Sequence, residues 1–176
     1  MAASRVDAPG ARAYFAGMLE SWPVRLLIVA ATVAAMEVVA AVVHRHVMHG
    51  WGWGWHRSHH EPGVRKVERN DLYGLVFAAI SLLFFSILAD AWPASWWVGL
   101  GMLVYGLLYA ALHDGLVHRR LPAPPTPRSG YLKRLVQAHR LHHSVRSRDG
   151  AVSFGFLYAP PAAHLRRRLR KLRAEP

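Results

Sequence analysis

The stretch VRLLIVAATVAAMEVVAAVVHRHVMHGWGWGWHRSHH (24–60) joins a long apolar run directly to a dense array of histidines. The apolar part, 24–43, has 20 residues, and Glu37 is its one acidic side chain. A helix needs about 20 apolar residues to cross the hydrocarbon core of a bilayer. This stretch therefore predicts a transmembrane helix that ends where the first histidine of the array, His44, begins.

Two further apolar runs, 72–89 and 94–112, contain no charged residue. Together with 24–43 they predict an all-α, integral membrane protein with about three transmembrane helices, folded as a single domain over 1–176. A soluble helical bundle is the alternative. Three such runs in 176 residues, of which 53% are hydrophobic, would leave that bundle little polar surface.

The basic residues are distributed unevenly around these runs. The turn 90–93 has no Lys or Arg, whereas 45–69 has five and the chain after His113 has 14 of the total of 22. Loops rich in Lys and Arg stay on the cytoplasmic side of a membrane. We therefore expect 44–71 and 113–176 to form a cytoplasmic helical cap, which would carry every clustered histidine.

The later segments of this cap differ in character. Residues 121–130 are rich in proline and predict a loop, and 131–144 predict a helix. Residues 154–163 are apolar but too short to span, so we expect them to lie at the interface or to re-enter the membrane and cover the site. Six of the eight residues 166–173 are basic, which favours contact with anionic lipid headgroups. RNA is the rival partner, but this tail has no aromatic side chains on which bases could stack, so no nucleic acid is expected.

Ten of the 12 histidines form four short groups at ligand spacing. Two groups read H-x4-H and two read H-x2-H-H, and their members are His44, His49, His56, His59, His60, His113, His118, His139, His142 and His143. The chain has no cysteine, which excludes a disulfide framework, an iron–sulfur cluster and a thiolate zinc site. Ten imidazoles are too many for one ion, so the pattern predicts a site for two metal ions. His46 and His164 stand outside the pattern and are expected to be structural or solvated.

The two spacings place the imidazoles differently on a helix. In H-x2-H-H, positions i, i+3 and i+4 share a face, so each triplet could present three imidazoles to one centre. In H-x4-H, the two residues lie about 140° apart around an α-helix and cannot meet at one point. Either each binds a different ion, or the helix unwinds between them. Imidazole suits iron, copper, nickel and zinc alike, so the ligands alone leave the metal open.

The residues around the histidines resemble the bacterial β-carotene hydroxylases, which belong to the fatty acid hydroxylase and sterol desaturase superfamily of membrane di-iron oxygenases. The resemblance rests on HRHVMHGWGWGWHRSHHEP (44–62), NDLY (70–73), HDGLVH (113–118), AHRLHH (138–143) and SFGFLYAPP (153–161). It runs from about Met36 to about Pro161, and none of the ten histidines departs from it. The first 20 residues and the basic tail lie outside it.

The resemblance implies a non-haem di-iron monooxygenase of the bacterial inner membrane, with its active site on the cytoplasmic side. It would insert oxygen from O2 at carbon 3 of β-ionone rings, converting β-carotene through β-cryptoxanthin to zeaxanthin, and would accept other β-ring carotenoids. The ten histidines would hold two iron ions, which zinc could replace in a recombinant preparation, and ferredoxin with its reductase would supply the electrons. The alternatives are a carotenoid ketolase, a fatty acyl hydroxylase or desaturase on the same scaffold, a metal transporter or sensor, and a metal-dependent hydrolase.

Other polar and aromatic residues near the histidines are candidates for supporting roles. An oxygen that accepts the distal N–H of a ligating imidazole fixes its orientation, and the candidates are Glu37, Glu61, Asn70, Asp71 and Asp114. Asn70 and Asp71 precede a predicted helix, so capping it is their simpler role, while Asn70 could instead hold a metal-bound water. The candidates for lining the substrate site are Trp51, Trp53, Trp55, Phe154, Phe156 and Tyr158. The tryptophans also fit an interfacial aromatic belt, which is the reading we favour.

Overall fold

The computed structural model describes residues 17, 21–61, 66–121 and 126–174, and these residues contain helices and no β-strand. In chain order the elements are α2 (Trp22–Val43), η1 (His44–Trp51), α3 (Trp53–His60), α4 (Asp71–Ser86), α5 (Ala94–Tyr109), η2 (Ala110–Val117), α6 (Gly130–His142) and α7 (Ala162–Ala174), where η marks a π-helical segment. The prediction of an all-α protein is confirmed. Most of the first 20 residues, and residues 122–125 of the predicted loop, lie outside the described residues.

Two helices are long and apolar enough to cross a membrane, and the first has a kink at Gly50, near its end. α2 and η1 together form a helix of 30 residues (Trp22–Trp51), and α5 and η2 together form one of 24 (Ala94–Val117). α4 has 16 residues, which at 1.5 Å per residue is about 24 Å and falls short of a hydrocarbon core of about 30 Å. The expected third span at 72–89 is therefore a shorter apolar helix, because the chain leaves the helix after Ser86 and turns toward α5.

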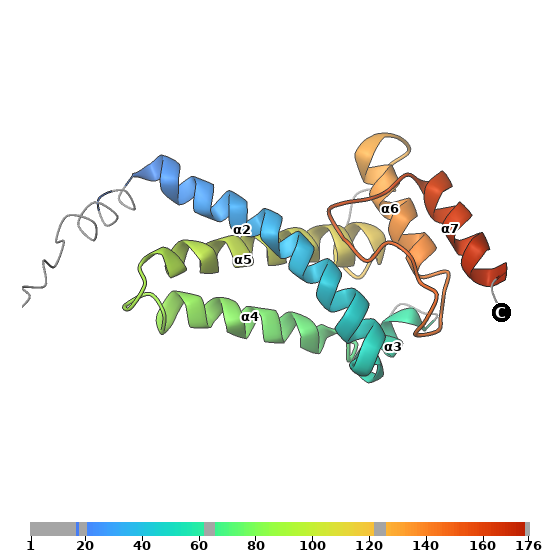
Figure 1. The fold of residues 1–176 in the computed structure, drawn as a ribbon, viewed down its shortest axis with the longest axis horizontal. Helices are drawn as coiled ribbons and strands as arrows, with labels where there is room; N and C mark the ends of the chain where they lie inside the picture. The colour runs from blue at the N-terminus through green and yellow to red at the C-terminus, as the bar shows by residue number, and fades with distance from the viewer. Residues whose placement is uncertain (1–16, 18–20, 62–65, 122–125, 175–176) are drawn as a thin grey trace, which may run out of the picture.

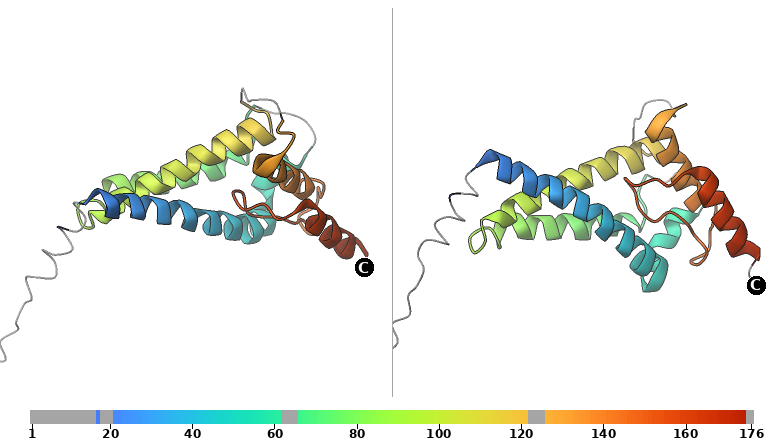
Figure 2. Two further views of the ribbon diagram at one scale, coloured as in Figure 1. Left: turned by 90° about the horizontal axis from the view of Figure 1, so that it is seen from above. Right: turned by 45° about the horizontal axis from the view of Figure 1, so that its top comes forward.

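The three long helices α2, α4 and α5 lie side by side and converge at the turn between α4 and α5 (Figure 1). α2 and α5 separate toward the opposite end, and α3, α6 and α7 pack there (Figure 2). We call this the wide end of the molecule. The elements that carry the clustered histidines, η1, α3, η2 and α6, all meet at the wide end.

Glycines in α5 let this helix approach both of its neighbours closely. A Cβ atom on Gly99 would lie 3.1 Å from the carbonyl oxygen of Ser81 in α4, and one on Gly101 would lie 2.5 Å from Cβ of Thr32 in α2. The Ser81 hydroxyl donates to the Gly99 carbonyl at 2.9 Å. Small residues at such contacts are typical of helices that pack in membranes. These contacts fix α2 and α5 relative to each other, and so fix the histidines that follow both helices.

Replacing Gly101 by alanine is expected to destabilise the fold, because the added methyl group would overlap Thr32 where the helices cross. Overpacking of this kind costs about 1–3 kcal/mol. Gly106→Ala, on the same helix, is the matched control, since a Cβ at Gly106 meets no atom within 4 Å. Thermal unfolding of both variants in detergent should give a lower midpoint for Gly101→Ala alone. Equal midpoints for the two variants would contradict the close contact between α2 and α5.

A small apolar core holds the wide end together. It includes the buried side chains Leu135 and Val136 of α6, Val152 from the segment before α7, and Leu165 and Leu169 of α7. The basic residues of α7 are exposed. α7 is therefore attached through its apolar face, and the basic face that the sequence assigns to lipid headgroups is left free of the core.

Candidate metal centre

Both H-x4-H pairs lie where the helix widens into π-helical winding. The N–H of Gly52 donates to the carbonyl of Val47, and the N–H of His118 donates to that of His113, each at 2.9 Å. A π-helix forms i→i+5 hydrogen bonds, so residues five apart lie on one side of it. The H-x4-H spacing allowed either two separate ions for each pair or a change in helical winding. The structure has the altered winding, and each pair points toward a single centre.

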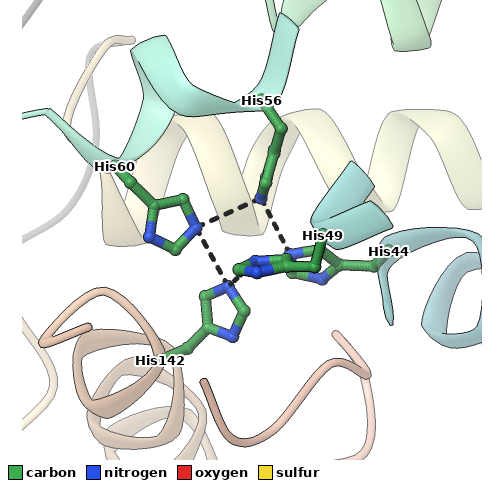
Figure 3. Close-up of side chains that lie close together, drawn as sticks. All are labelled: His44, His49, His56, His60 and His142. Atoms are coloured by element: carbon green, nitrogen blue, oxygen red, sulfur yellow. Dashed lines mark hydrogen bonds between the residues drawn. The ribbon is translucent and has the colours of Figure 1, made fainter. Parts of the chain in front are cut away.

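Five histidines from three elements direct one nitrogen each toward a common point, as Figure 3 shows. We call them the first cluster, and its members are His44 and His49 of η1, His56 and His60 of α3, and His142 of α6. Their candidate ligand atoms all lie within 4.8 Å of one another. The Nε2 atoms of His44 and His60 are each 3.1 Å from that of His56, and the Nε2 atoms of His49 and His60 are each 3.2 Å from that of His142.

The second cluster contains His59, His113, His118 and His139. Nε2 of His59 is 3.0 Å from that of His113, and Nε2 of His118 is 2.9 Å from that of His139. The ring of His143 lies 4.6 Å from the rings of His59 and His139, centroid to centroid. Nε2 of His143 is buried and has no hydrogen-bond partner among the described residues. A buried nitrogen without a partner is costly, so we place His143 with the second cluster as its fifth donor.

The H-x2-H-H triplets do not each serve one centre, as their shared helix face suggested. In α3, His56 and His60 join the first cluster and His59 the second, and α6 divides its histidines between the same two clusters. A triplet spans about 100° of the helix surface, which is wide enough to face two neighbouring centres. The rings of His60 and His143 stack at 4.4 Å. The two clusters are therefore immediate neighbours.

Each imidazole has one ring nitrogen that faces away from the clusters. In seven of the ten imidazoles, this nitrogen is hydrogen-bonded to an oxygen atom. The Nδ1–H groups of His44, His49, His60 and His142 donate to the backbone carbonyls of Phe154, Arg148, Val145 and Val152. Those of His56, His59 and His113 donate to side-chain oxygens of Asn70, Glu68 and Asp114. Carbonyl and carboxylate oxygens only accept, so the proton lies on Nδ1 and the lone pair on Nε2 points inward.

Inward lone pairs about 3 Å apart repel one another unless a cation lies between them. Protons are poor candidates for that cation. Burial lowers the pKa of His60 and of His118 to about 4, and that of His143 to about 2, with neighbouring positive groups adding to the effect. The imidazoles are therefore neutral at physiological pH, which is the form that binds metal. The donor set fits two divalent transition-metal ions, one in each cluster.

The spacing of the nitrogens is short enough for each cluster to hold one ion. With metal–nitrogen bonds of about 2.1 Å, two ligands of one ion lie about 3.0 Å apart at right angles and about 3.4 Å apart in a tetrahedron. The closest pairs of Nε2 atoms are 2.9–3.2 Å apart. Each cluster therefore has nitrogens close enough to share an ion.

Two of the five polar candidates, Asn70 and Asp114, accept hydrogen bonds from clustered histidines. Asn70 accepts from His56 at 2.6 Å, and its side chain makes no hydrogen bond that caps α4. Asp114 accepts from its own neighbour His113 at 2.8 Å. Asp71 instead pairs with Arg120 at 2.6 Å, and Arg120 continues to Asp114 at 3.3 Å. Asp71 thus reaches the second cluster only through this ion-pair chain.

Glu68, and not the expected Glu61, is the glutamate that holds a clustered histidine. Glu61 forms an exposed ion pair with Arg57 at 3.4 Å. Glu68, which the sequence reasoning missed, accepts from Nδ1 of His59 at 2.8 Å and is buried. Its only signal in the sequence is a carboxylate close to Asn70 at the start of α4. The carbonyl acceptors of the other imidazoles leave no sequence signal.

Glu37 accepts more hydrogen bonds than any other candidate residue, although none of them comes from a clustered histidine. Its carboxylate accepts the backbone N–H groups of Phe156, Leu157 and Tyr158 at 2.6–2.9 Å. It also accepts the hydroxyl of Tyr105 at 2.9 Å. The same segment supplies the Phe154 carbonyl that holds His44. Glu37 therefore supports the first cluster indirectly, by fixing residues 154–158 across it.

The six aromatic candidates divide into two groups. Trp53, Phe154 and Phe156 contact clustered histidines: Trp53 lies 5.2 Å from His49, Phe154 lies 5.3 Å from the same ring, and Phe156 lies 5.4 Å from His113, all between ring centroids. The other three, Trp51, Trp55 and Tyr158, are exposed at the surface. Exposed tryptophans at the end of a long apolar helix agree with an interfacial belt.

Comparison with known proteins identifies the family of this chain. The sequence model of the fatty acid hydroxylase family matches residues 29–159. The chain is 56% identical over 148 residues to a β-carotene hydroxylase of Paracoccus sp. (strain PC1), an alignment that covers 84% of this chain and 91% of that protein. It is also 56% identical over 151 residues to the β-carotene hydroxylase of Pantoea ananas, covering 85% of this chain and 86% of that one.

More distant relatives include the chloroplastic β-carotene 3-hydroxylase 1 of Arabidopsis thaliana, which is 36% identical over 147 residues, or 81% of this chain and 46% of the plant protein. No solved structure matches the chain. The match to the family model covers most of the chain and includes all ten clustered histidines. The chain belongs to the fatty acid hydroxylase family, and its relatives include bacterial β-carotene hydroxylases that are 56% identical to it.

Proposed function

We propose that this protein is a membrane carotenoid hydroxylase that adds a hydroxyl group at carbon 3 of β-ionone rings, converting β-carotene through β-cryptoxanthin to zeaxanthin. The observation that carries the proposal is the pair of adjacent histidine clusters, with their nitrogens directed inward, at the ends of two long apolar helices. The bacterial relatives named above add support through their names and their 56% identity.

Two iron ions are the metals that we propose for the clusters. Nitrogen-only donors suit ferrous iron, and imidazole alone would not exclude zinc. When bound, the metal supplies activation of O2, which no amino-acid side chain can provide. A monooxygenase reaction consumes two electrons for each hydroxyl group formed. Ferredoxin and its reductase would supply these electrons.

The residues of the chain keep this chemistry selective. The Nδ1–H bonds hold seven of the ten imidazoles as the neutral tautomer, and the segment 154–158 covers the first cluster. Carbon 4 of a β-ionone ring is allylic, so its C–H bond is weaker than the bond at carbon 3. Attack at carbon 3 therefore depends on positioning of the ring, which can change a barrier by several kcal/mol.

The membrane arrangement is part of the proposal. We place the wide end at the cytoplasmic surface of the bacterial inner membrane, because the basic residues gather in the segments around it. α2 with η1 and α5 with η2 would cross the bilayer, and the shorter α4 would accompany them. The histidine clusters would then lie at the depth where a lipid-dissolved ring can reach them.

Expression in a host that produces β-carotene, followed by chromatography of the pigments, tests the function. Zeaxanthin and some β-cryptoxanthin are expected. Canthaxanthin would show a ketolase on the same scaffold, and unchanged β-carotene in cells that contain the metal-loaded protein would refute the proposal.

A further inference from the structure

A cleft of about 750 Å³ opens beside the first cluster, between α2, the segment 153–161 and the start of α7. Ligand pockets in proteins generally have volumes of about 300–1,000 Å³. The lining of this cleft includes the apolar side chains of Val38, Ala41 and Val42 of α2 and of Phe154 and Pro160 of the crossing segment. The polar lining residues include Glu37, Arg45, His46, His164 and Arg168.

One wall of the cleft belongs to the membrane-spanning part of α2. Val38, Ala41 and Val42 are three and four residues apart, so they share one face of the helix. The side chains of Val38 and Val42 are 64% and 52% exposed. In a bilayer these side chains would face hydrocarbon, so the cleft is open to a molecule that arrives through the lipid.

The opposite wall ends at the metal ligands. The ring of Phe154 lines the cleft, and its centroid lies 5.5, 5.3 and 5.4 Å from those of His44, His49 and His142. All three contacts are edge-on, so Phe154 is a single aromatic layer between the cleft and the first cluster. The guanidinium of Arg45 lies over the same ring at 5.8 Å.

A second opening reaches the clusters from another direction and has a different character. It measures about 250 Å³ and is lined by ligand histidines together with Glu61, Glu68, Arg140 and Arg146. A hydrocarbon ring gains nothing from charged walls, because burying these groups against it would cost their hydration. The larger cleft also carries charged side chains, but most of its exposed lining is apolar, so it suits an apolar molecule better than the smaller opening does.

We propose that this larger cleft binds one terminal ring of the carotenoid, with the polyene leaving along Val38 and Ala41 into the bilayer. Phe154 forms its inner end in this structure, so its side chain must rotate aside before carbon 3 of the ring can reach the first cluster. This inference rests on the proposed function and adds to it the site and the direction of entry. The guanidinium groups of Arg45 and Arg168, which also line the cleft, could instead attract a lipid phosphate. A bound phospholipid is therefore the rival occupant that the experiment must separate.

Two neighbouring residues of α2 provide a matched test. Val38 lines the cleft, whereas Val39 is also exposed, at 43%, but does not line it. Val38→Trp should fill the cleft, while Val39→Trp adds the same bulk on another side of the helix. Each variant is purified in mild detergent from β-carotene-producing cells, and zeaxanthin formation, iron per chain, and carotenoid and phospholipid retained per chain are measured.

The expected result is that Val38→Trp lowers both zeaxanthin formation and retained carotenoid at least about tenfold, with the iron content unchanged. Val39→Trp should stay within about twofold of the parent in every measurement. Parental activity in Val38→Trp, equal losses in both variants, or a loss of phospholipid instead of carotenoid would overturn the site. A parent that retains carotenoid without hydroxylating it would refute the proposed function, and the retained pigment would still report on the cleft.

Discussion

Replacing His142 by alanine is expected to abolish hydroxylation and to empty the first cluster of metal. His142 is fully buried, and its Nε2 lies 3.2 Å from those of both His49 and His60. Its Nδ1–H is fixed by the carbonyl of Val152. Loss of a residue that merely orients a ligand costs about 10–100-fold in affinity or activity, so loss of a ligand itself should cost more than about 100-fold.

The measurement combines zeaxanthin formation with the metal content of the purified variant. His46→Ala is the control for metal content, because His46 is an exposed histidine of η1 that belongs to neither cluster. His46→Ala should keep the parental metal content, and His142→Ala should keep the metal of the second cluster alone. Parental metal content and activity in His142→Ala would show that the first cluster does not bind metal.

Replacing Glu37 by alanine is expected to destabilise the protein and to loosen the first cluster more than the second. The substitution would leave three consecutive backbone N–H groups and the Tyr105 hydroxyl without their acceptor. A buried polar group left without a partner costs about 1–3 kcal/mol. Because some of these groups can be rehydrated, we expect a total loss of about 3 kcal/mol in the free energy of unfolding.

Thermal unfolding and metal content together distinguish this support from a general defect. Glu37→Gln keeps one carbonyl oxygen and should fall between the parent and Glu37→Ala. Glu61→Ala is the control, since the exposed pair of Glu61 with Arg57 is worth about 0–1 kcal/mol. An unchanged unfolding midpoint in Glu37→Ala would mean that residues 154–158 hold their position without the carboxylate.

The sequence predicts the helices and the histidine groups, because apolar runs and ligand spacing are local properties. The third span was overestimated for the same reason: residues 87–89 continue the apolar run, but the turn toward α5 removes them from the helix. Hydropathy measures apolar length and does not record where a hairpin must turn.

The division of the ten imidazoles between two clusters could not be read from spacing. The π-helical winding of η1 and η2 turns each H-x4-H pair to one side, and each triplet is divided because both clusters take histidines from α3 and from α6. Both depend on tertiary structure. The groups that hold the imidazoles are predictable only in part. Backbone carbonyls such as those of Val145 and Val152 can belong to any residue, whereas Asn70 and Asp114 act through their side chains and can be recognised in the sequence.

The most direct test of the two-metal site is the iron content of the protein after purification and anaerobic reconstitution with ferrous iron, combined with X-ray absorption at the iron edge. Two iron ions per chain, each with nitrogen ligands at about 2.1 Å, are expected. One iron ion per chain, or a first shell dominated by oxygen, would contradict the assignment of the ten histidines to two metal centres.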